Sequence, residues 1–245
     1  MDIVDNIRKK QRLLALRPPK PPELHRPEML YIGCVDARLD PIDDIGIPKG
    51  KALIYRNIAA LVAKKSSGDA LDPAQISSSG EIPQSVSVGA VLEFFLNHIP
   101  HDADKPRHIV IAGHTDCGGL KACRHGKAGE HDEYLPIYLD NLKEVRATVM
   151  EKAQAQGWDQ DRILKELEEE SVRKSIENLM EYKAVKKALA DGTLVVHGWV
   201  LDTGSQRINE MDLQTGQFKP MGTDIAATHA DDVIQSQAQN ANGRA

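Results

Sequence analysis

Short apolar runs alternate along the chain with longer stretches in which apolar residues recur at helical spacing. The runs predict buried strands, because a strand of a parallel sheet is covered on both faces and carries few polar residues. Four such strands are predicted: Met29–Gly33, Ala52–Tyr55, Ile109–Gly113 and Leu194–Leu201. Strands that alternate with helices predict one α/β domain with a mainly parallel central sheet flanked by helices.

The predicted helices precede or separate these strands. In Gln84–His98 the apolar residues share one face, which is typical of a helix packed on a sheet. The other predicted helices are Val4–Leu16, Arg56–Lys65, Gly118–Arg124, Pro136–Ala155 and Asp161–Leu189. Within the last of these, the acidic run Glu166–Glu170 is interpreted as a solvated face. A turn at Asp202–Ser205 predicts a late hairpin, with Gln206–Met211 as the returning strand.

The polar segments set the domain boundaries. Residues 17–27 hold five prolines, which exclude a helix interior, so residues 1–28 are predicted to be an N-terminal helix and an extended arm. Residues 29–227 are predicted to form the single α/β domain, with long loops at 66–81 and 125–133. Residues 228–245 have little apolar surface to bury, which predicts a disordered tail.

Composition narrows the class of protein. Hydrophobic residues make up 41% and charged residues 27% of 245 residues, as in a folded globular enzyme. The net charge of −5 argues against a nucleic-acid-binding surface, and no run is long and apolar enough to predict a membrane span. The charged N-terminus predicts no secretory signal, and three cysteines are too few for a disulfide framework. We therefore expect a cytoplasmic protein whose cysteines are metal ligands or core residues.

Candidate metal ligands follow two of the predicted strands. Cys34 comes directly after Met29–Gly33, and His114 and Cys117 come after Ile109–Gly113. Because the carboxyl ends of parallel strands lie at one edge of a sheet, these three side chains can converge there. Two thiolates and one imidazole suit zinc, and three protein ligands leave the fourth position open, as in catalytic sites. The alternative for the cysteines is plain core packing.

Asp36 and Arg38, two residues apart, are the candidate catalytic pair. A bidentate ion pair would keep Asp36 ionised and fix its direction beside the metal. The carboxylate could then orient a metal-bound water, or it could take the open coordination position itself. The alternative is a surface ion pair of little energetic value.

These motifs resemble those of the β-class carbonic anhydrases. The strings Cys-x-Asp-x-Arg and His-x-x-Cys-Gly-Gly are similar to the family's two site motifs. Tyr55–Ala59 resembles its Arg-Asn segment, and Val196–Val200 resembles its late strand. The similarity extends over roughly residues 29–211.

The resemblance implies an activity and a role for each motif residue. Cys34, His114 and Cys117 would bind Zn²⁺. The Asp36–Arg38 pair would orient a zinc-bound hydroxide that attacks carbon dioxide, in the reversible hydration of carbon dioxide to bicarbonate and a proton. The resemblance also implies a homodimer or homotetramer in which the N-terminal arm packs on a partner subunit. Further expected contacts to an anion or substrate are Arg56 and Gly118.

Two departures from the family pattern leave alternatives open. Ala37 replaces a serine that many members carry after the aspartate, and Tyr31 stands where some bicarbonate-inhibited members have tryptophan. The alternatives are a carbon disulfide or carbonyl sulfide hydrolase on the same scaffold, or a catalytically silent bicarbonate-binding zinc protein.

Two thiolate ligands acidify a bound water less than three histidines do, so we expect activity to rise above neutral pH.

Overall fold

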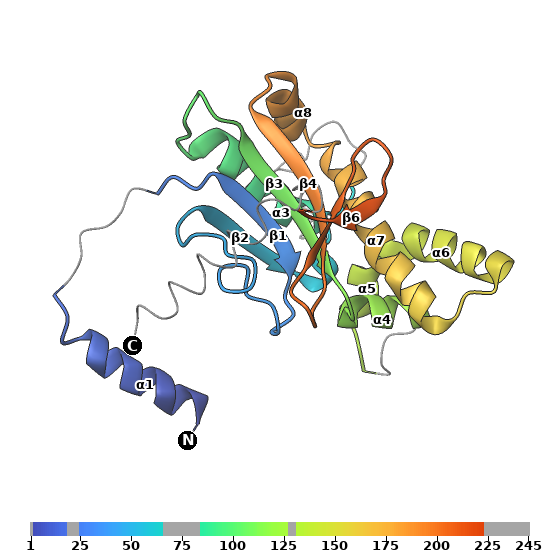
Figure 1. Cartoon of the computed structure of the whole chain (residues 1–245), viewed down its shortest axis with the longest axis horizontal. Helices are drawn as coiled ribbons and strands as arrows, with labels where there is room; N and C mark the ends of the chain where they lie inside the picture. Colours follow the sequence, from blue (N-terminus) through green and yellow to red (C-terminus); the bar gives the residue numbers. More distant parts are fainter. Residues whose placement is uncertain (1, 19–24, 66–83, 127–130, 223–245) are drawn as a thin grey trace, which may run out of the picture.

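The computed structural model describes residues 2–18, 25–65, 84–126 and 131–222. Six strands form one sheet in the order β2-β1-β3-β4-β5-β6. The strands are β1 (Met29–Cys34), β2 (Ala52–Asn57), β3 (Arg107–His114), β4 (Leu194–Leu201), β5 (Ile208–Met211) and β6 (Phe218–Pro220). The first four are parallel, and β5 and β6 add antiparallel pairs at one edge. The predicted α/β fold, with a mainly parallel sheet and a late hairpin, is confirmed (Figure 1).

Helices and short helical turns connect these strands. They are α1 (Ile3–Leu14), η1 (Ile58–Ala60), α3 (Gln84–Glu93), the π-helical turn η2 (Phe94–His98), α4 (Gly118–His125), α5 (Leu135–Leu139), η3 (Asp140–Leu142), α6 (Lys143–Gln156), α7 (Gln160–Leu179) and α8 (Lys183–Ala190). Helices α3, α7 and α8 pack on one face of β1, β3 and β4 in the largest apolar cluster. Helix α1 stands apart from the sheet in Figure 1 and buries none of its residues.

The predicted helix Arg56–Lys65 is wrong. Strand β2 continues through Asn57, and only Ile58–Ala60 turns helically. The side-chain amide of Asn57 donates a hydrogen bond to the carbonyl of Leu61 and accepts one from its N–H, each at 2.8 Å. These two hydrogen bonds close a tight loop where a helix was expected to start. Ala59 has a φ of +61°, which no regular α-helix contains.

The single helix predicted over Asp161–Leu189 is two helices, α7 and α8. Tyr182, which lies between them, has extended backbone angles. Its hydroxyl donates to the carbonyl of Ala63 at 2.9 Å, so the break lets this side chain reach the loop after η1. The stretch predicted over Pro136–Ala155 is likewise interrupted, at η3 between α5 and α6.

The predicted loop 66–81 and the predicted tail 228–245 lie outside the described residues, as do residues 19–24 of the proline-rich arm and residues 127–130 of the predicted loop 125–133. No helix in the described ranges is long and apolar enough to cross a membrane.

Candidate metal centre

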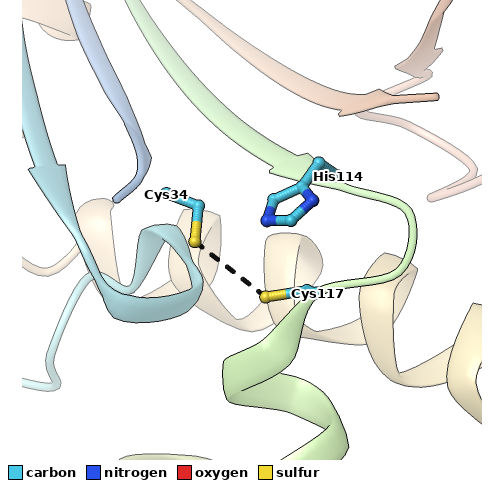
Figure 2. Close-up of side chains that lie close together, drawn as sticks. All are labelled: Cys34, His114 and Cys117. Atoms are coloured by element: carbon cyan, nitrogen blue, oxygen red, sulfur yellow. Dashed lines mark hydrogen bonds between the residues drawn. The ribbon is translucent and has the colours of Figure 1, made fainter. Parts of the chain in front are cut away.

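The candidate ligands lie at the carboxyl edge of the parallel sheet, on the ends of two strands and the start of a helix. Cys34 is the last residue of β1, His114 is the last residue of β3, and Cys117 caps the start of α4. Their ligand atoms lie within 4.8 Å of one another, and all three residues are buried (Figure 2). The structure therefore brings together the three residues that the sequence singled out. Within the described ranges, this is the only Cys, His, Asp or Glu group with metal-binding geometry.

The imidazole of His114 is held in the orientation that a metal requires. Its Nδ1–H donates to the carbonyl of Thr115 at 2.9 Å, which leaves Nε2 as the atom with a free lone pair. Nε2 is buried and has no hydrogen-bond partner among the described residues. A buried polar atom without a partner is costly, and a metal ion would satisfy it.

The two thiols complete the donor set. Their Sγ atoms lie 4.0 Å apart and share one hydrogen bond, which lowers the pKa of Cys34 and raises that of Cys117. A bound divalent cation would deprotonate both thiols. Two sulfurs and one imidazole nitrogen fit zinc, and the set leaves a fourth coordination position for a non-protein ligand.

The Asp36 carboxylate lies beside this group. Arg38 donates to it three times: from its main-chain N at 3.0 Å, from Nε at 2.9 Å and from Nη2 at 2.7 Å. These hydrogen bonds hold the pKa of Asp36 well below its usual range. Asp36 Oδ2 is 3.9 Å from His114 Nε2, so the carboxylate faces the ligand group while Arg38 holds it. The pair forms at the turn that follows β1.

Arg56 and Gly118, the expected anion contacts, both lie beside the segments that carry the ligand group. Arg56 donates to the main-chain carbonyls of Cys34 at 2.7 Å and Asp36 at 2.5 Å, so it fixes the backbone that carries these residues. A Cβ at Gly118 would meet no atom within 4 Å, so steric room does not require glycine there. At Gly119 a Cβ would lie 2.6 Å from Ile58 Cγ2, so packing against η1 requires glycine.

Glu168 is a site residue that sequence reasoning missed. The acidic run was interpreted as a solvated face, but Glu168 is 3% exposed and its Oε1 accepts the N–H of Asp116 at 2.6 Å. Burial raises its pKa to about 7, against the opposing effect of the main-chain N–H groups of Asp116 and Cys117. Helical spacing was the available signal, because Leu164, Glu168 and Val172 share one face of α7.

Two further residues of metal-binding type lie outside the ligand group. Cys123 is buried in the same apolar cluster as Cys34 and Cys117 but is not one of the three grouped residues. Both ring nitrogens of His197, on strand β4, form hydrogen bonds, Nε2 with His108 and Nδ1 with Glu210.

The profile of the carbonic anhydrase family matches residues 29–208, which is most of the chain. The chain belongs to the β-carbonic anhydrase family. A carbonic anhydrase of Synechococcus elongatus is 28% identical over 74% of this chain and 59% of its own length. The mitochondrial β-carbonic anhydrase 6 of Arabidopsis thaliana is 25% identical over 70% of this chain and 52% of its own length. The chain therefore spans between half and three fifths of these two curated relatives.

Solved β-carbonic anhydrases have the same fold. One of two tetrameric enzymes from Sordaria macrospora has a TM-score of 0.64 at 26% identity, covering 89% of this chain and 96% of that chain. A β-carbonic anhydrase of Aspergillus fumigatus has a TM-score of 0.59 at 26% identity, covering 85% of this chain and 83% of that chain.

Proposed function

We propose that this chain is a zinc-dependent carbonic anhydrase that catalyses the reversible hydration of carbon dioxide to bicarbonate and a proton. The observation that carries the proposal is the buried Cys34, His114 and Cys117 group, in a chain of this family, with His114 Nε2 left for a metal. Zinc bound there would supply a Lewis acid that acidifies a water molecule. The proposed ligands are these three residues.

Asp36 and Arg38 are the proposed catalytic pair. The Asp36 carboxylate stays ionised because Arg38 donates to both of its oxygens, so it accepts a hydrogen bond from the reacting water and directs a lone pair toward carbon dioxide. Its low pKa makes it a poor store for the released proton. Its role is therefore orientation, and the proton leaves to solvent or buffer.

Carbon dioxide is small and apolar, so it needs an apolar approach more than polar recognition. The cluster that contains Cys34 and Cys117 also includes Leu61 and Leu120, and Ile58 packs against it. We propose that this surface receives carbon dioxide beside the metal.

The test is carbon dioxide hydration by zinc-loaded protein, run in parallel with sulfide release from carbonyl sulfide and carbon disulfide. Hydration without sulfide release supports the proposal. Sulfide release alone would assign the sulfur-substrate reaction. Measurable bicarbonate binding by calorimetry with neither reaction would assign a silent bicarbonate-binding protein. A Cys34→Ser variant in the same assays shows whether any turnover depends on the proposed metal.

We also propose that the chain assembles as a homodimer or homotetramer. Helix α1 exposes its apolar side chains, among them Ile3, Ile7 and Leu13, and buries none of its residues on its own chain. Such a face is stable when another surface covers it. Light scattering of the full chain, compared with an Ile7→Glu, Leu13→Glu variant, should show a higher mass for the full chain. We place the protein in the cytoplasm, where its three free cysteines would stay reduced.

A further inference from the structure

The guanidinium of Arg38 lies between two carboxylates. One of its edges, Nε and Nη2, donates to Asp36. Its other donors reach the loop after β3: Nη1 donates to Asp116 Oδ2 at 3.0 Å, and Nη2 also donates to the main-chain carbonyl of Asp116 at 3.1 Å. Arg38 thus ties the loop that carries Asp36 to the loop that lies between two of the proposed metal ligands.

Asp116 is placed by its backbone conformation and by two contacts. Its backbone has a φ of +63°, in the left-handed region that aspartate and asparagine tolerate better than most residues. Its N–H donates to buried Glu168, and its side chain forms an ion pair with Lys121 on α4. The Asp116 side chain is 50% exposed, so the hydrogen bond from its backbone to buried Glu168 is what places the carboxylate beside Arg38.

Arg38 needs such an anchor. Its side chain is 48% exposed, whereas that of Asp36 is 16% exposed. An exposed arginine held by a single ion pair keeps much of its rotamer freedom. If the Arg38 side chain moved away, Asp36 would lose two of its three donors, and its Oδ2, 3.9 Å from His114 Nε2, could approach a metal bound by the ligand group.

We propose that Asp116 is a positioning residue: it holds the second edge of the Arg38 guanidinium, and so keeps the Asp36 carboxylate on Arg38 instead of on the metal. This inference rests on the proposed function. Asp116 is one of the two residues between His114 and Cys117, and its place in the motif does not reveal this role.

Three variants of the zinc-loaded protein test the proposal. Asp116→Gly removes the carboxylate without straining the left-handed backbone, and Asp116→Asn keeps the side-chain shape while removing its charge. The matched control is Asp191→Asn, which removes an exposed carboxylate paired with Lys187 on α8, far from the site. Each is measured for zinc content, for kcat and KM, and by ¹⁵N NMR of the Arg38 Nε–H, assigned by its loss in Arg38→Lys.

The expected loss of kcat is about two- to fivefold for Asp116→Gly and smaller for Asp116→Asn, the scale of an exposed ion pair. KM should not change, because the apolar approach to the site is untouched. The Arg38 Nε–H signal should broaden through faster exchange with water, while zinc content stays at one per chain. Asp191→Asn should match the wild type throughout.

Two results would overturn the inference. One is an Asp116→Gly protein whose kcat and Arg38 signal equal those of the control. The other is loss of zinc from both Asp116 variants, which would give the residue a role in the ligand loop alone. Failure of the proposed function is distinct, because wild-type protein would then show no hydration while the NMR comparison would still report on Arg38.

Discussion

Replacement of Asp36 by asparagine tests whether this residue orients the reacting water without binding the metal. The carboxylate accepts two side-chain hydrogen bonds from Arg38, at 2.9 Å and 2.7 Å. An amide of the same shape offers only one acceptor, so one guanidinium donor would face an NH₂ group. The reacting water would also lose a charged acceptor. Zinc should remain, because Asp36 is not one of the three residues that form the candidate ligand group.

The size of the effect follows from the hydrogen bond that is weakened. A hydrogen bond to a charged group contributes about 1.5–3 kcal/mol. Each 1.36 kcal/mol added to the barrier slows the reaction by about tenfold, so Asp36→Asn should lower kcat by about 10- to 150-fold. The dissociation constant for zinc should change far less than kcat.

The assay pairs stopped-flow hydration with zinc analysis of the same sample. Asp43→Asn serves as the control, because Asp43 is exposed on the loop after Arg38 and should leave both quantities unchanged. A variant at position 36 that keeps kcat within twofold of wild type would refute the orienting role. Loss of zinc from that variant would instead make Asp36 a ligand.

Three further predictions concern stability. Removing zinc with a chelator should lower the Tm of the wild type, because a ligand that binds only the folded state stabilises that state. The Tm of Cys117→Ser should not change. Equal Tm values for the wild type with and without zinc would contradict the prediction. Burial, together with His197, lowers the pKa of His108. The stability that neutral His108 contributes is therefore present above pH 6.5 and lost as the pH falls. Lowering the pH from 7.5 to 5 should reduce the free energy of unfolding, measured with urea, more in the wild type than in His108→Asn. Equal reductions would contradict this prediction. Leu167 is fully buried in the cluster that contains Cys34 and Cys117. Its replacement by alanine should lower the free energy of unfolding by about 2–5 kcal/mol, and a loss below about 1 kcal/mol would show that the cluster is loosely packed.

The parts of the fold that could be predicted are those encoded in local pattern. The runs around Ile32, Ile111 and Val196 are apolar on both faces, so their strands and the parallel sheet follow from the sequence alone. The convergence of Cys34, His114 and Cys117 follows in turn, because strand ends share an edge.

The parts that could not be predicted depend on contacts between distant residues. The helix expected after Tyr55 is replaced by a loop that the Asn57 side chain closes, and helix α7 ends where the Tyr182 hydroxyl reaches Ala63. Glu168 looked solvated in an acidic run because its partner, the N–H of Asp116, lies 52 residues away. The hydrogen bonds of Arg56 Nε and Nη2 likewise depend on main-chain carbonyls 22 and 20 positions away.

The most direct measurement is stopped-flow carbon dioxide hydration by wild-type protein carrying one zinc per chain, from pH 6.5 to 9. Two thiolate ligands leave the metal little net charge with which to acidify a water molecule, so turnover should climb with pH across this range. A zinc-loaded protein with no turnover at any pH would contradict the proposed activity. A profile already flat from pH 6.5 would contradict the weak acidification on which the mechanism depends.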